Sequence, residues 1–228
     1  MPHSWFSGCC VSVLVLASSL GSMPDAVASV AVSPTGTAVT PPHAAAAKAR
    51  ICYEQADQDA DNGIVSMNWE PMFDMYDAQA VDDFVLSRPC HRPVISVEGS
   101  YLQAVSPADS FNVTIYRDKK HHPGKVLRDL HSLEYTDDCG DFGCADISLG
   151  RKLKPGHWWV SVQANMNYVE SSGYWNWWTK ESVRHTAARW QNPADGYGTG
   201  CTTYTDLITC VGDDLGMGGD LSFSISSS

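Results

Sequence analysis

Residues 156–166 read GHWWVSVQANM, and this stretch decides the fold class. Trp158, Val160 and Val162 stand at every second position, with Trp159 and a serine between them. Successive side chains of a β-strand point to opposite faces of the sheet, so this alternation predicts a strand with one face in the core.

The same period of two recurs along most of the chain. It is found in residues 111–116 (FNVTIY), in 221–225 (LSFSI) and in 94–102 (VISVEGSYL), where we expect Gly99 to form a bulge. Turn signals separate these runs, at residues 106–109, 122–124, 155–156 and 212–214. Many short strands between turns predict an all-β protein, an antiparallel β-sandwich with jelly-roll-like topology.

The N-terminus predicts export. An apolar run at residues 10–16 (CVSVLVL) is too short for a membrane span, which needs about 20 apolar residues, and Ala26-Val27-Ala28 follows as a cleavage site. We therefore expect a signal peptide at 1–28, a flexible linker or pro-segment at 29–49, and one β-sandwich domain at 50–228. The alternative for the first segment is a disordered apolar tail.

Six cysteines in the expected mature domain predict a disulfide framework, because thiols oxidise outside the cytosol. Short loop closure favours the pairs Cys52–Cys90, Cys139–Cys144 and Cys201–Cys210, although six cysteines allow fifteen pairings. The spacing does not fit a zinc site. Disulfides and export together predict a secreted or periplasmic protein.

The net charge of −11 disfavours nucleic acid and anionic lipid as partners, and it suits calcium. No second apolar stretch is long enough for a membrane span. We expect structural Ca²⁺, if any cofactor, at a set of aspartates: Asp57, Asp59, Asp61, Asp82 and Asp83. The alternatives are a solvated acidic loop for the first three and hydrogen bonding to backbone amides or an arginine for the other two.

Residues 174–178 (YWNWW) carry the strongest binding hypothesis. In a strand, Trp175 and Trp177 share one face, while Tyr174 and Trp178 share the other. One set can enter the core, and the other would then form an aromatic platform for sugar rings. The alternative is that both faces are covered and all these residues are core.

Three longer stretches carry a family resemblance. They are residues 66–85 (SMNWEPMFDMYDAQAVDDFV), 156–166 and 190–205 (WQNPADGYGTGCTTYT). Together they resemble a family of secreted, mostly bacterial β-sandwich proteins with the pattern YDxQxADDF, GxYWxSVQA and WQNPGGGFGTGCTTW. Trp69 stands where that family has Phe, and Tyr197 replaces another aromatic residue. The resemblance implies the fold and secretion, and the family has no established activity.

No catalytic signature accompanies these features. The chain has no HExxH, no GxSxG and no Cys-His pattern, and its glutamates are too scattered to assign a glycosidase pair. We therefore expect a non-catalytic secreted protein that binds a glycan or another cell-surface ligand through exposed aromatic residues. The alternatives are an extracellular hydrolase acting on polysaccharide or peptide, and a purely structural exported protein.

Overall fold

The structure is a computed structural model that describes residues 49–55, 59–137, 143–212 and 216–228. The described residues belong to one compact unit. The expected signal peptide (1–28), and all of the expected linker (29–49) except its last residue, lie outside the described residues. Both stay predictions.

Strands make up most of the described chain, as the period of two predicts. They are β1 (Arg50–Glu54), β2 (Asp59–Val65), β3 (Met67–Asn68), β4 (Gln79–Leu86), β5 (Pro93–Val97), β6 (Gly99–Leu102), β7 (Ser110–Asp118), β8 (Pro123–Leu133), β9 (Tyr135–Thr136), β10 (Ala145–Ser148), β11 (Gly156–Asn165), β12 (Tyr174–Lys180), β13 (Arg189–Gln191), β14 (Thr205–Asp206), β15 (Asp220–Leu221) and β16 (Phe223–Ser227). The described helical segments are η1 (Pro71–Tyr76), α1 (Tyr168–Ser171) and α2 (Leu207–Val211). None of these is long and apolar enough to cross a membrane.

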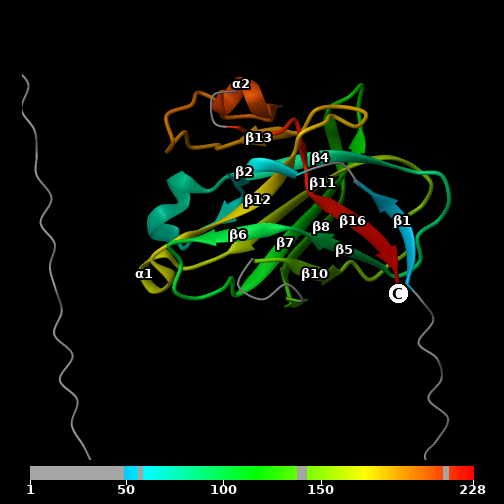
Figure 1. Cartoon of the computed structure of the whole chain (residues 1–228), viewed down its shortest axis with the longest axis horizontal. Helices are drawn as coiled ribbons and strands as arrows, with labels where there is room; N and C mark the ends of the chain where they lie inside the picture. The colour runs from blue at the N-terminus through cyan, green and yellow to red at the C-terminus, as the bar shows by residue number, and fades with distance from the viewer. Residues whose placement is uncertain (1–48, 56–58, 138–142, 213–215) are drawn as a thin grey trace, which may run out of the picture. The chain divides into compact units, whose positions relative to one another are not determined.

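The strands form three sheets. The largest has the order β14-β13-β4-β11-β7-β8, with β3 paired to β11; the others are β1-β16-β5-β10-β9 and β15-β12-β2, with β6 paired to β12. In Figure 1, β11 and β7 run through the middle of the molecule, and β1 lies beside β16 near the C-terminus. All these pairings are antiparallel except β3–β11. This confirms an all-β antiparallel fold with sandwich-like packing, whereas jelly-roll topology stays a prediction.

Strand β11 shows why alternation alone understates burial. Val160 and Val162 are fully buried on the core face, as predicted. Trp159, on the opposite face, is also fully buried. Its indole N–H donates to Asp118 (3.0 Å), and the guanidinium of Arg189 lies 5.9 Å from its ring centroid. The outer face of the sheet is therefore covered near Trp159.

The predicted bulge at Gly99 is wrong, because Gly99 begins a new strand. The chain leaves one sheet after β5 and joins another as β6, so residues 94–102 are two strands. A side chain at Gly99 would collide with the indole of Trp175 and with the backbone oxygen of Asn176. Glycine is needed here because β6 passes directly over a core tryptophan.

Disulfides tie down both ends of the domain. Cys52–Cys90 joins β1 to the segment after β4, and Cys201–Cys210 closes the loop that leads to α2. Both predicted pairs are confirmed. Cys144 is also disulfide-bonded, while its predicted partner, Cys139, lies outside the described residues.

Candidate functional site

Strand β12 separates the predicted tryptophans into two groups. Trp175 and Trp177 are fully buried, and their indole N–H groups donate to backbone oxygens at 2.7 and 2.8 Å. Both rings are part of the core and have no surface for a ligand. Trp178 and Tyr174 are half-buried on the opposite face. Any ligand surface on this strand is therefore restricted to these two side chains.

Tyr174 lines a pocket with almost entirely aromatic walls. The pocket has a volume of about 300 Å³. Its walls are six side chains, which we call the aromatic pocket: Trp69, Phe73, Tyr76, Tyr168, Tyr174 and Tyr197. Ligand pockets are typically concave and apolar with a few polar groups, and this volume lies at the small end of their range.

Segments far apart in the sequence build the aromatic pocket. Trp69 precedes η1, which supplies Phe73 and Tyr76; Tyr168 begins α1; and Tyr197 follows β13. Pro71 is the first residue of η1, where its fixed φ and missing N–H suit a helical start. The pocket thus combines residues from the first and third stretches of the family resemblance.

Asn192 fixes these segments against one another. Its side chain is fully buried and its amide donates to the backbone oxygens of Met75 and Asp77, both at 2.8 Å. Its carbonyl accepts from the N–H of Tyr197 at 3.1 Å. The backbone of Gly196 also donates to Met75, at 3.1 Å. Tyr197 is therefore held against η1 before any ligand arrives.

The rings of the pocket support one another edge to face. Tyr168 lies with its ring centroid 5.6 Å from Trp69 and 5.1 Å from Phe73, and Tyr76 lies 5.5 Å from Tyr197. Their planes cross at 60° to 81°. Aromatic pairs favour this geometry. The walls therefore keep their arrangement through contacts within the protein.

Polar atoms at the pocket are few and distinct. Trp69 is only 7% exposed, and its Nε1 makes no hydrogen bond of normal geometry among the described residues. Burial raises the pKa of Tyr197 to about 12, and a side-chain interaction with the indole N–H of Trp69 offsets part of that rise. The phenol is thus protonated at neutral pH. A buried N–H without a well-formed hydrogen bond costs about 1–3 kcal/mol, so an acceptor on a ligand would relieve this cost at Trp69.

A second depression, of about 350 Å³, lies on the outer face of the largest sheet. We call it the amide groove, and its lining includes Asn68, Asp77, Gln79, Asn112 and Gln163. Gln79 donates to Gln163 at 2.9 Å, which fixes the orientation of both amides. Asn68 and Asp77 directly follow or precede pocket residues in sequence. The groove offers oriented donors and acceptors next to the segments that form the aromatic pocket.

Asp77 stands at this junction. Burial raises its pKa to about 6, the N–H of Trp69 offsets part of the rise by donating to Oδ1 at 2.7 Å, and Asp74 adds to it. The carboxyl group therefore changes charge between pH 5 and 7.

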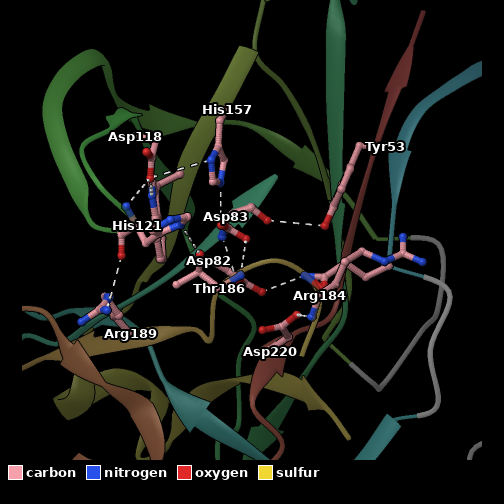
Figure 2. Close-up of polar contacts among 12 residues, drawn as sticks. Tyr53, Asp82, Asp83, Asp118, His121, His157, Arg184, Thr186, Arg189 and Asp220 are labelled. Carbon is pink, nitrogen blue, oxygen red and sulfur yellow. Dashed lines mark hydrogen bonds and ion pairs between the residues drawn. The ribbon is translucent and has the colours of Figure 1, made fainter. Parts of the chain in front are cut away.

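The predicted pair Asp82 and Asp83 is buried within the protein (Figure 2). Asp82 accepts from the side chain of Gln55 (2.7 Å) and from the N–H groups of Leu221 (2.8 Å) and Asp83 (2.7 Å). Burial and the nearby Asp220 raise its pKa well above the ordinary range. Protein donors therefore hold Asp82, and calcium at Asp82 and Asp83 stays a prediction.

Asp83 points to the other face and holds a histidine. Its carboxylate lies 2.5 Å from Nε2 of His157, while Nδ1 of that ring lies 3.9 Å from Asp118 (Figure 2). The rings of His121 and His185 lie 6.3 and 6.1 Å from His157. Asp83 therefore fixes the orientation of the imidazole, and Asp118 lies near its other nitrogen while accepting from the indole of Trp159.

The remaining calcium candidates lie where the structure describes no side chains. Asp57 lies outside the described residues, and the side chains of Asp59 and Asp61 in β2 are likewise not described. Where side chains are described, no group of three or more acidic, histidine or cysteine residues could hold a metal ion. Calcium stays a prediction for this loop.

Most of the aromatic pocket is not evident from local sequence patterns. Tyr174 is a predicted site residue, and Trp69 and Tyr197 stand out only as aromatic substitutions within the family pattern. Tyr76 is the first residue of the YDxQxADDF pattern, but that pattern says nothing of a pocket, and Phe73 and Tyr168 have no distinguishing signal because their neighbours in space are distant in sequence. No protein-family model, curated protein or solved structure matches the chain.

Proposed function

We propose that the protein is a secreted, non-catalytic binding module that holds the end of a neutral glycan in the aromatic pocket. The observation that carries this proposal is the pocket walled by six aromatic side chains, in which the buried Nε1 of Trp69 makes no hydrogen bond of normal geometry. Sugars have apolar CH faces that stack on aromatic rings, and hydroxyl groups that accept hydrogen bonds. The pocket supplies both kinds of contact.

The amide groove extends this proposal from a single sugar to a chain. Its ordered side-chain amides are suited to the alternating donors and acceptors of sugar hydroxyls. Asn68 and Asp77 would contact the units that follow the one held by Trp69 and Tyr76. The disulfides Cys52–Cys90 and Cys201–Cys210 support a role outside the cytosol.

Two pocket residues allow a clean test, because their side chains are exposed enough for the fold to survive truncation. Tyr168 is 44% exposed and Tyr197 is 40% exposed. We expect Tyr168→Ala and Tyr197→Ala each to weaken binding of a neutral oligosaccharide chosen on a glycan array. The loss of a stacking aromatic residue at a binding hot spot costs about 2 kcal/mol or more, which is about 30-fold in affinity.

Val183→Ala is the matched control, since Val183 is 52% exposed and lies outside the pocket. Its affinity and melting temperature should equal those of the wild type. Equal affinity in all three variants would contradict the proposed site. If the pocket binds tetramethylammonium but no sugar, its ligand is a quaternary ammonium compound and the glycan proposal is wrong. Release of reducing ends from a bound polysaccharide would contradict the non-catalytic role.

A further inference from the structure

A basic groove interrupts the acidic surface. It has a volume of about 780 Å³ and is lined by five cationic side chains, Arg117, Arg128, Arg151, Lys152 and Lys154. The only acidic residue in its lining is Asp129. The whole chain has 15 lysines and arginines against 26 aspartates and glutamates. Five of the chain's 15 cationic residues thus gather at one groove, where the described residues contribute a single acidic side chain.

The groove is held in shape by the protein itself. Arg128, on the edge strand β8, donates to the backbone oxygens of Leu149 (3.1 Å) and Lys152 (2.7 Å). The indole of Trp158 donates to the oxygen of Lys154 at 3.1 Å. Leu153 exchanges two backbone hydrogen bonds, of 3.0 and 2.9 Å, with the disulfide-bonded Cys90. The loop between β10 and β11 is therefore fixed at several points.

The cations of the groove outnumber its one described carboxylate, Asp129, by five to one. None of the five forms an ion pair within the described part of the chain. Burial lowers the pKa of Arg128, and the positive charge of Arg151 lowers it further. Arg151, Lys152 and Lys154 are exposed to solvent. An anionic group between these side chains would relieve their mutual repulsion.

Apolar side chains form the floor of the groove. Leu149, Leu153 and Trp158 line it and are 4%, 1% and 7% exposed, and Leu127, which also lines it, is 37% exposed. The guanidinium of Arg117 lies 5.4 Å from the ring centroid of Trp158. An apolar floor below a cationic rim is complementary to a ligand that has apolar faces and acidic substituents.

We infer that the basic groove binds an anionic oligosaccharide, a sugar chain that carries carboxylate or sulfate groups. Such a chain places acidic groups at the cationic rim and the CH faces of its rings over the floor. A nucleic acid duplex or an anionic membrane is larger than the groove and would meet the net negative charge of the chain. The basic groove and the aromatic pocket have no lining residue in common, so this site is separate from the proposed neutral-glycan site.

Calorimetric titration of the full secreted protein tests this inference. The probes are a heparin-derived hexasaccharide (sulfate), an oligogalacturonate (carboxylate), maltohexaose (neutral) and a short single-stranded DNA of similar charge. We expect one or both of the charged sugars to bind, and to bind more weakly when NaCl rises from about 50 to about 200 mM. The sulfate and carboxylate probes identify which acidic group the groove prefers.

Arg151→Ala/Lys152→Ala is the test variant, because both side chains are exposed. It should weaken binding of the charged sugar by about tenfold or more, since charge-assisted hydrogen bonds are lost. Lys119→Ala/Lys125→Ala removes the same charge from exposed positions outside the groove and should change binding less than about twofold. Neither variant should alter neutral-glycan binding at the aromatic pocket.

Three outcomes would overturn the inference. The first is that neither charged sugar binds. The second is that maltohexaose binds as tightly as the charged sugars, which would remove the role of the cations. The third is that DNA binds as tightly as they do, or that both double variants lose affinity equally, because the interaction would then be general electrostatic attraction.

Discussion

Replacing Asn192 by alanine tests how the aromatic pocket is held together. The fully buried side chain makes three hydrogen bonds, two to backbone oxygens of the η1 region and one from the N–H of Tyr197. A hydrogen bond contributes about 0.5–1.5 kcal/mol net, and a buried group left unpaired costs about 1–3 kcal/mol. Three bonds therefore give a loss of about 3 kcal/mol in the free energy of unfolding.

Urea denaturation measures this loss. With an m-value of about 2 kcal/mol/M, the midpoint should fall by about 1.5 M, and glycan affinity should fall with it because Tyr197 is released. Gln191→Ala is the matched control: its half-buried side chain makes one such bond, to Gln79 at 2.6 Å, and we expect a loss of about 1 kcal/mol. An unchanged midpoint for Asn192→Ala would refute the argument that these bonds hold the pocket.

Three further changes test other parts of the structure. Trp177→Ala should destabilise the fold by about 3–5 kcal/mol, as truncations of large core residues do, whereas Trp178→Ala should destabilise it less because Trp178 is half-buried. Equal melting temperatures of the two variants would contradict the assigned burial. Replacing Cys52 and Cys90 together by serine should cost about 2–4 kcal/mol in chemical denaturation, and no loss would show that the bridge is dispensable. The folded-state pKa of Asp77, about 6, exceeds its unfolded value, so the stability contributed by its protonated form is present below about pH 4 and is lost as the pH rises through 6. Asp77→Asn should flatten this part of the profile of unfolding free energy against pH. A profile identical to that of the wild type would exclude Asp77 as its source.

Alternation in the sequence predicts the strands well because each side chain reports directly on its own face. It predicts β11 and the all-β class, and short loop closure predicts both described disulfides. Alternation fails where a residue distant in sequence determines the local structure. At Gly99 the chain changes sheets and passes so close to the Trp175 indole that no side chain fits. That contact joins residues 76 positions apart, and no local pattern contains it.

The candidate site is less accessible to sequence reasoning for the same reason. Tyr174 is predicted from the aromatic strand β12, but its more prominent neighbours Trp175 and Trp177 are core. Tyr76 and Tyr197 meet because Asn192 connects their segments through backbone hydrogen bonds. An amide that organises a pocket in this way has no signature of composition or periodicity.

The most direct test of the proposed function follows the indole N–H resonance of Trp69 by NMR while a neutral oligosaccharide is added. Trp69→Phe assigns that resonance, and the buried, hydrogen-bonded indoles of Trp175 and Trp177 serve as internal references. Because Nε1 of Trp69 makes no hydrogen bond of normal geometry among the described residues, a ligand oxygen that accepts from it should shift its resonance strongly and leave the references in place. A sugar that binds without moving the Trp69 resonance would contradict the account.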